Sequence, residues 1–412
     1  MPSHLTGQRI ARYLIAARQA EALALEQLLG LSRLVVAVSN LIHALQRERG
    51  ATGIYAGSGG TRFGQQRQRW LIETDLQLGC FEDQLIHVDH ALPVDASSRL
   101  LTRLATAVHQ LDTLSRCRDR ASRLQVTTEQ VHQYYTDLIR ALLAVVLEVA
   151  NAATDPDISR ALVALFHFMQ GKELAGQERA LGGMRLSSGR TGSIPAERLA
   201  LLIEGQERCF ETFTRFADGH SLSLWHEQAS PCDLTALRQL RHILNQTTSD
   251  EQTDAALSER WFDVCTRRID AMKQVEDALE ENVRQTSEIR LAAACHDLEH
   301  YREDVLAARA PAPPENLPTI GDGPDNAGLG RTLMDLLQSQ SSRLHQIEEE
   351  LEQARAALDE RKLLDRAKVM LMKHRGLREE EAHALMRKMA MNQGRKLVDV
   401  ARAVLSMVDV LE

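Results

Sequence analysis

Prolines are concentrated in one short stretch of this 412-residue chain, because five of its ten prolines fall between Pro311 and Pro324. Proline lacks a backbone N–H and its ring clashes with the preceding helical turn, so a helix does not run through such a stretch. Together with the Gly, Asp and Asn residues around them, these prolines predict an extended linker over residues 310–330. A chain of this length can form two or three domains with cores of their own. We therefore expect one domain over residues 1–309 and a second part over residues 331–412.

The composition favours helices on both sides of the linker. Aromatic residues make up 4% of the chain, and Leu, Ala, Arg, Glu and Gln are abundant. These residues suit helix interiors, whereas strands favour β-branched and aromatic side chains. The sequence therefore predicts an all-α protein.

Turn signals divide the first domain into long helical segments. Pro93, Pro156, Pro195 and Pro231 each mark the end of one segment or the start of the next. Long helices joined by short turns pack as antiparallel bundles, and the segments are too many for one four-helix bundle. We expect two linked bundles, built mainly from Ala22–Arg49, Ser98–Arg120, Glu129–Ala152, Pro195–Ala217, Leu234–Leu244 and Ser258–Arg309.

A heptad pattern follows the linker, over residues 331–362. A helix with apolar residues at this spacing can form a coiled coil that pairs two chains, so we expect a homodimer through this segment. The alternative is an ordinary amphipathic helix that packs on its own module. The heptad positions are taken by Leu337, Leu344, Leu351 and Leu358, with Leu333, Ile347 and Ala354 between them.

The last segment, residues 363–412, reverses the charge of the chain. It holds ten Lys and Arg residues against seven carboxylates, a formal charge of +3, whereas the whole chain carries −8. Such a reversal indicates a polyanionic partner. Three short helices are expected, at Leu363–Lys373, at Glu379–Met391 and from Arg395 onward, with Gly376 and Gly394 at the turns. The cations left for the surface, and therefore the candidate nucleic-acid contacts, are Lys368, Lys373, Arg387, Lys388, Arg395 and Lys396.

Three short helices also describe a helix-turn-helix that docks on DNA, and charge alone does not separate the two nucleic acids. The order of residues does favour one of them, because it resembles the ANTAR antitermination domain along the whole segment. The resemblance implies binding to structured RNA, here stem-loops in a leader mRNA. Val369 departs from the pattern, since many members of that family carry Gly there. The matching positions are Ala367-Lys368, Leu371-Met372, Gly376-Leu377, Ala382, Arg387, Ala390-Met391 and Arg395-Lys396.

Two elements of the first domain are similar to each other. Leu45–Gly53 and Lys172–Gly182 each place a Gln and a Glu-Arg pair before a small residue. The pair of elements, followed by Trp261 and Arg268-Ile269-Asp270, resembles the NIT (nitrate- and nitrite-sensing) domain over roughly residues 35–290. The resemblance implies a helical sensor whose ligand is nitrate or nitrite, and no cofactor.

The candidate ligand contacts follow from this resemblance. Nitrate is a small planar anion, and the planar guanidinium of arginine offers paired donors of matching geometry. We expect Arg49 and Arg179 to contact the anion, with Arg238 as a third contact and Arg241 as its competitor. Glu48 and Glu178 are expected to orient these arginines or to cap the network. The small residues Gly50, Ala51, Gly176 and Ala180 are expected to let a ligand approach the backbone. The alternative is that Arg49 and Arg179 form intrahelical ion pairs on an exposed surface.

Other chemistry has little support in the sequence. There is no P-loop, GxSxG or GxGxxG motif, and the six cysteines include no CxxC pair. Glu129 and His132 form a Glu-x-x-His motif without the second copy that a di-iron centre needs. The longest apolar runs, such as Ala141–Val146, are far shorter than the ~20 residues of a spanning helix, and the N-terminus lacks the apolar core of a signal peptide. We expect a cytoplasmic protein without a membrane segment, a metal or catalytic activity.

Together the two resemblances imply a nitrate- or nitrite-responsive antitermination regulator. Anion binding to the sensor would release the ANTAR-like module to bind leader-RNA hairpins and prevent termination. The alternative is a DNA-binding transcriptional regulator whose helical domain senses another small anion.

Overall fold

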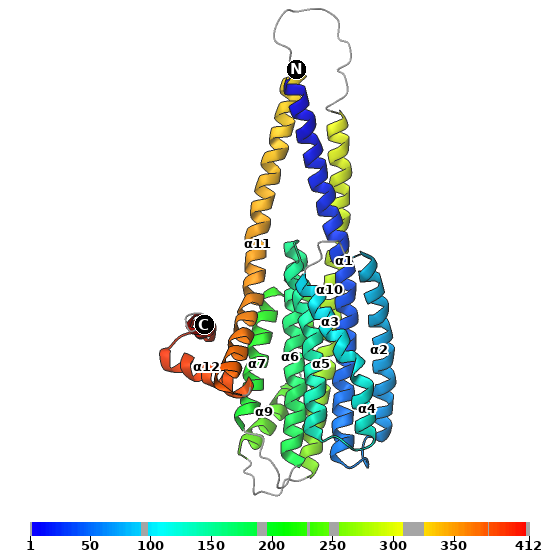
Figure 1. The fold of residues 1–412 in the computed structure, drawn as a ribbon, viewed down its shortest axis with the longest axis vertical. Helices are drawn as coiled ribbons and strands as arrows, with labels where there is room; N and C mark the ends of the chain where they lie inside the picture. The colour runs from blue at the N-terminus through cyan, green and yellow to red at the C-terminus, as the bar shows by residue number, and fades with distance from the viewer. Residues whose placement is uncertain are drawn as a thin grey trace, which may run out of the picture.

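The computed structural model describes residues 2–91, 98–187, 196–228, 231–246, 255–307, 325–377 and 379–408, and these residues contain no strand. The prediction of an all-α fold is confirmed (Figure 1). The helices are α1 (Pro2–Gly57), α2 (Gly64–Ala91), α3 (Ser98–Asp112), α4 (Leu114–Ser122), α5 (Thr128–Ala152), α6 (Pro156–Ser187), α7 (Ala196–Phe216), α8 (Gly219–Gln228), α9 (Pro231–Gln246), α10 (Ala255–Ala307), α11 (Asp325–Arg375), α12 (Glu379–Gln393) and α13 (Leu397–Val408).

The helices of the first domain fall into two groups that share one core. α1 packs against α2 and α5, α6 packs against α7 and α10, and the pairs α1–α10 and α5–α6 join the groups. Apolar side chains from both groups form one continuous cluster, which includes Leu41, Val146, Phe168 and Val275. Full burial of such a side chain stabilises the fold by roughly 1.5–3 kcal/mol. The two expected bundles are therefore joined into one through the contacts of α1 with α10 and of α5 with α6.

Local sequence sets several helix ends. Thr127 and Gln130 form a reciprocal capping box at the start of α5. The Asp155 carboxylate accepts from the backbone N–H groups of Asp157 and Ile158, with Pro156 as the first residue of α6. The segment expected as one helix over Ser98–Arg120 is instead two helices, α3 and α4, which meet at Thr113.

Two long helices, α2 and α6, were missing from the expected set. α2 is rich in Gln and Arg and presents exposed apolar residues such as Ile72 and Leu76, so its pattern gives no clean apolar stripe. α6 is apolar on most of its circumference in its first half, because it lies in the centre of the domain. A helix of this kind shows weak periodicity, which explains why the periodic pattern did not mark it.

α11 is continuous from Asp325 to Arg375 and contradicts two expectations. It crosses the boundary expected at residue 363, so the heptad segment and the first helix of the basic module are one helix. Leu351, Ala354 and Leu358 are buried within this single chain, and Ala354 and Leu358 belong to the core shared with α6. In this part of the helix the apolar stripe therefore packs on the sensor of its own chain. Residues 310–324 of the expected linker lie outside the described residues, and residues 325–330 are helical because α11 begins at Asp325. The side chains of Leu333, Leu337 and Leu344 also lie outside the described residues.

The end of α11, α12 and α13 form the expected small module. Ala367, Ala382, Met386, Val400 and Ala401 make its separate apolar core. The chain turns at Gly376 and Gly394, both of which have positive φ (63° and 58°), a conformation that glycine adopts without strain.

α1 contains a stretch, within Arg9–Gly57, that is long and apolar enough to cross a membrane by composition alone. Of that stretch, 72% is buried inside the protein, as expected for the central helix of a folded domain. The same stretch was not recognised as a long apolar run in the sequence.

Candidate functional site

Arg49 and Arg179 lie in the centre of the first domain, on α1 and α6. Their exposed fractions are 2% and 6%, so the alternative of intrahelical ion pairs on an exposed surface is wrong. Burial of two cations in a helical core is costly unless anions or hydrogen bonds compensate. The partners of the two arginines therefore define what the site can bind.

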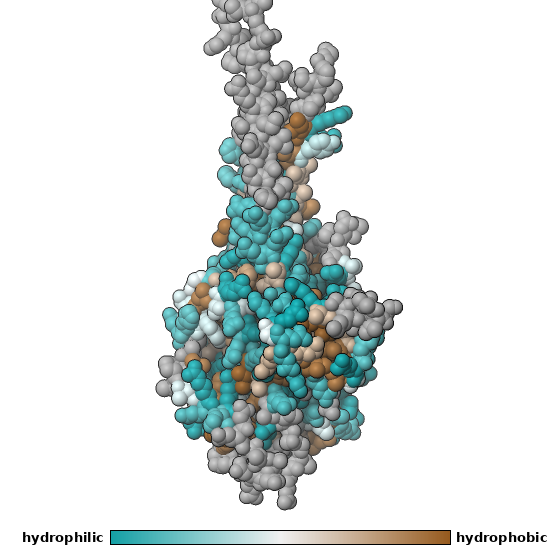
Figure 2. Space-filling model, turned by 90° about the vertical axis from the view of Figure 1, so that its left-hand side faces the viewer, coloured by the Kyte–Doolittle hydropathy of each residue, from teal (hydrophilic) through white to brown (hydrophobic). Residues whose placement is uncertain are grey.

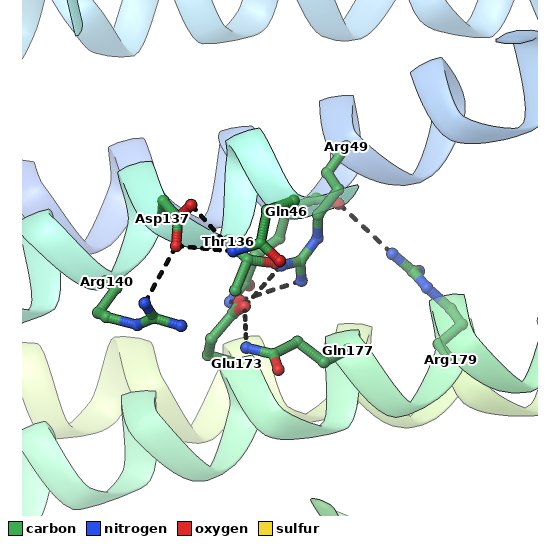
Figure 3. A network of polar contacts seen from close by, with 9 residues as sticks. Gln46, Arg49, Thr136, Asp137, Arg140, Glu173, Gln177 and Arg179 are labelled. Carbon is green, nitrogen blue, oxygen red and sulfur yellow. Dashed lines mark hydrogen bonds and ion pairs between the residues drawn. The ribbon is translucent and has the colours of Figure 1, made fainter. Parts of the chain in front are cut away.

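Arg49 is fully engaged in the structure (Figure 3). Its Nη1 and Nη2 donate to the two carboxylate oxygens of Glu173 on α6, at 2.5 and 3.0 Å, and Nη1 also donates to the Thr136 hydroxyl on α5 at 3.1 Å. The side-chain amides of Gln46 and Gln177 donate to the same carboxylate, each at 2.9 Å. A bidentate pair of this kind is among the strongest side-chain interactions.

Arg179 lacks such a partner. Its Nη1 donates to the Thr266 hydroxyl at 3.1 Å and its Nη2 to the backbone oxygen of Gln46 at 3.5 Å, while its guanidinium lies 5.1 Å from the centre of the Phe262 ring. Among the described residues no carboxylate lies within ion-pairing distance of Arg179. Burial, and next the charge of Arg49, lowers the pKa of Arg179 to about 10. Arg179 therefore stays charged at neutral pH, and none of the described residues is its counter-ion.

Glycines allow the two arginines to lie against opposite helices. A Cβ at Gly176 on α6 would be 2.7 Å from Nη2 of Arg49, and a Cβ at Gly50 on α1 would be 3.0 Å from Nη2 of Arg179. Each guanidinium thus rests on the backbone of the helix that carries the other arginine. The small residues were expected to admit a ligand, but the structure uses these two glycines to admit the arginine heads.

Neither Glu48 nor Glu178 pairs with the arginine next to it, although Glu178 does hold Arg241. Glu48 is fully buried and accepts from Nε and Nη2 of Arg118, both at 2.8 Å, and from the Tyr135 hydroxyl at 2.5 Å. The reason is geometric, because residues next to each other on a helix point about 100° apart. Each of these glutamates therefore faces away from the arginine that follows it.

Arg238 and Arg241, the two candidates for a third ligand contact, lie in different surroundings. Arg238 is exposed, whereas Arg241 donates to both oxygens of Glu178 at 2.6 and 2.8 Å. Gln206 donates to Glu178 as well, and Arg268 lies 3.6 Å from it. The structure therefore places Arg241, and not Arg238, in the buried polar network beside Arg179.

Glu173 is the important site residue that the sequence did not single out. It was part of the second element, but its role depends on the way α1 and α6 face each other. A signal was present: Glu173 lies three residues before Gly176, so both fall on one face of α6. An arginine that rests on Gly176 can therefore reach Glu173.

The candidate nucleic-acid residues differ in exposure. Lys373, Lys388, Arg395 and Lys396 are exposed, and the side chain of Arg387 is 43% exposed. Lys368 is 8% exposed and lies 2.8 Å from the Asp365 carboxylate, so it is the least accessible of the set. Figure 2 looks onto the side of the molecule on which α11 lies and shows mainly hydrophilic residues there.

One face of the basic module touches the sensor. Arg387 on α12 pairs with Glu204 on α7 at 3.1 Å, and Arg208 on α7 lies 3.4 Å from the His383 ring on α12. A shallow, open pocket of about 410 Å³ lies at this junction, lined by Glu204, Arg387 and Arg395 among others. Part of the expected nucleic-acid surface therefore meets a sensor carboxylate in this structure.

Comparisons with known proteins agree with both parts of the architecture. A family model described as "Nitrate and nitrite sensing" (NIT) matches residues 40–284, and the ANTAR domain model matches residues 352–405. The "Nitrate regulatory protein" of Klebsiella oxytoca is 32% identical over 396 residues, which cover 95% of this chain and 93% of that protein. The solved "Structure of the NasR transcription antiterminator" is similar with a TM-score of 0.61 and 31% identity, over 98% of this chain and 100% of that one. This chain therefore belongs to the family of regulators that join a NIT sensor domain to an ANTAR domain.

Proposed function

We propose that this protein is a nitrate- or nitrite-responsive regulator that prevents transcription termination when its anion is bound. One observation carries the proposal: of the two buried guanidiniums on α1 and α6, only that of Arg49 pairs with a carboxylate, and no described residue supplies a counter-ion to Arg179. A small monovalent anion next to Arg179 supplies the missing charge. The proposal describes a regulator and not an enzyme.

The ligand class follows from the chemistry of the site. The Arg179 guanidinium lies against the backbone at Gly50 and near the Phe262 ring, and an anion would have to bind within these close contacts. Nitrate and nitrite are planar and spread their charge over their oxygens, and an arginine fork can donate two parallel hydrogen bonds to such an ion. The related protein from Klebsiella oxytoca is named a nitrate regulatory protein, which supports this choice.

The route from ligand to output runs through α6 and α7. α6 carries Glu173 and Arg179 at the site, and the same helix packs against Ala354 and Leu358 of α11. α7, which packs on α6, carries the Glu204 that pairs with Arg387. We propose that an anion that draws α1 and α6 together shifts α6 and α7, loosens these contacts and frees the basic module.

The freed module binds hairpins in a leader transcript. Glu204 pairs with Arg387 in this structure in the way that an RNA phosphate would pair with it in a complex. Arg395 and Lys396 at the turn between α12 and α13, together with Lys373 and Lys388, form the rest of the proposed RNA surface. A competition between an RNA hairpin and a DNA duplex of the same sequence distinguishes this function from that of a DNA-binding regulator.

The proposal also concerns cellular location and assembly. A protein that reads nascent RNA acts in the cytoplasm of a bacterium, and we propose this location. We also propose that a homodimer forms through residues 331–362. Because Leu351 and Leu358 are buried in one chain, their use in a coiled coil requires that α11 leaves the sensor first. Dimerisation and release of the module would then be linked.

Calorimetric titration of the purified protein tests the sensor. We expect saturable binding of nitrate or nitrite, weak binding of chloride and sulfate, and loss of binding in Arg49→Ala and Arg179→Ala. Arg238→Ala serves as a matched control, since this arginine is exposed and should leave binding unchanged. An absence of nitrate and nitrite binding to the wild-type protein refutes the proposed sensor function.

A further inference from the structure

Glu173 is a buried carboxylate that belongs to the anion site itself. Its side chain is 3% exposed, and it accepts hydrogen bonds from Arg49, Gln46 and Gln177. These donors come from α1 and α6, so the carboxylate is held between the two helices that carry the arginines (Figure 3). The Glu173 carboxylate therefore supplies one negative charge to the site.

Among the described residues, the buried charges at the site add up to one uncompensated positive charge. Arg49 and Arg179 contribute two positive charges and Glu173 contributes one negative charge. Asp270 also acts on Arg179, but its side chain is 48% exposed and pairs with Arg47 at 3.1 Å. His132, the buried imidazole near Arg49, is neutral, because burial and next the charge of Arg49 lower its pKa to about 3.

We propose that Glu173 is a specificity-determining residue that makes the site accept anions of one negative charge and reject those of two. This inference rests on the proposed function, because it assumes that an anion binds beside Arg49 and Arg179. It goes further by assigning the choice between nitrate-like and sulfate-like anions to one carboxylate of this chain.

The physical reason is the balance of charge in a buried site. A monovalent anion brings the three side chains and the ligand to neutrality. A divalent anion leaves an excess negative charge next to Glu173, and like charges that are buried together repel strongly because little water screens them. Removing the charge of Glu173 leaves two arginines that match a divalent anion. The arginines alone, without Glu173, do not favour one negative charge over two.

The test uses two anions of the same shape, perchlorate and sulfate, which differ in charge. In Glu173→Gln we expect the sulfate-to-perchlorate affinity ratio, measured by calorimetry, to rise by about tenfold or more. Glu48→Gln is the matched control: it removes a buried carboxylate that neighbours Arg49 in sequence but pairs with Arg118. Its ratio should equal that of the wild type. An unchanged ratio in a folded Glu173→Gln protein overturns the proposal.

A charge-restoring pair of variants decides the matter if Glu173→Gln alone does not fold. Arg179→Gln leaves no net positive charge and should lose anion binding. Glu173→Gln combined with Arg179→Gln restores one positive charge and should regain perchlorate and nitrate binding but not sulfate binding. A double variant that stays unable to bind monovalent anions overturns the proposal. Failure of the wild-type protein to bind nitrate refutes the sensor function instead, so the two failures are distinguishable.

Discussion

Replacing Arg179 by methionine removes a buried charge that has no carboxylate partner among the described residues, so this change should not destabilise the sensor. The magnitude follows from its pKa, which burial and then Arg49 lower from 12.5 to about 10. At ~1.4 kcal/mol per pKa unit, keeping Arg179 charged in this position costs about 3 kcal/mol. The lost hydrogen bond to Thr266 and the lost contact with Phe262 offset this by ~1 kcal/mol each. We therefore expect the free energy of unfolding to rise by about 1 kcal/mol in anion-free buffer.

Arg49→Met is the contrasting variant. Arg49 forms a bidentate pair with Glu173, and removal of one partner leaves a buried carboxylate without its cation. Breaking such a pair typically costs about 3–5 kcal/mol. Both free energies are measured by urea unfolding followed by circular dichroism, with and without nitrate. Nitrate should stabilise the wild-type protein by RT ln(1 + [L]/Kd), which is about 2.7 kcal/mol at a hundredfold excess over Kd. It should not stabilise either variant. If Arg179→Met destabilises the anion-free protein as much as Arg49→Met does, Arg179 is a structural residue and the reasoning fails.

Three further predictions concern the site, the junction and the core. Gly176→Ala places a Cβ 2.7 Å from Nη2 of Arg49 and should weaken nitrate binding in calorimetry by about tenfold or more; Gly183→Ala, which meets no atom within 4 Å, should not. Glu204→Ala should raise the affinity for hairpin RNA in the absence of nitrate, as measured by fluorescence anisotropy, because it frees Arg387. The control is Glu211→Ala, which changes an exposed residue of the same helix. Equal RNA affinities in the two variants would contradict the proposal that Glu204 restrains the basic module. Burial raises the pKa of Glu280 to about 7, so the folded state holds this proton more tightly than the unfolded state and its contribution to stability is lost as pH rises from ~5 through 7. The difference in unfolding free energy between Glu280→Gln and the wild type should therefore change between pH 5 and 8 by on the order of 2 kcal/mol, and a constant difference would show that Glu280 does not titrate there.

The fold class and the small basic module were predictable because they depend on local signals. The chain has few aromatic residues, which favours helices over strands. Turn residues, and capping residues such as Thr127, set the ends of helices through neighbours only a few positions away. The partner of the heptad segment was not predictable. An apolar stripe such as Leu351, Ala354 and Leu358 needs an apolar surface, and the sequence does not say whether that surface belongs to the same chain or to a second one.

The site was predictable only in part. The two arginines were recognisable through the resemblance to the NIT family, and the structure brings them together. The assignment of their carboxylates failed because ion pairs across helices depend on which faces meet, and this depends on tertiary packing. Helical geometry alone could have favoured Arg241 over Arg238, because Arg241 lies about 40° from Leu237 around α9, whereas Arg238 lies about 100° away. Leu237 is buried, so Arg241 was the better candidate for an inward position.

The most direct test of the account measures nitrate affinity by calorimetry with and without a saturating leader-RNA hairpin. If anion binding frees the basic module for RNA, linkage requires that RNA tightens nitrate binding by the same factor by which nitrate tightens RNA binding. We expect this factor to be about 5 to 150, the range typical of allosteric coupling. Glu204→Ala should reduce the factor, because in that variant part of the restraint on the module is already absent. A nitrate affinity that is the same with and without the hairpin, in a protein that binds both ligands, would contradict the account.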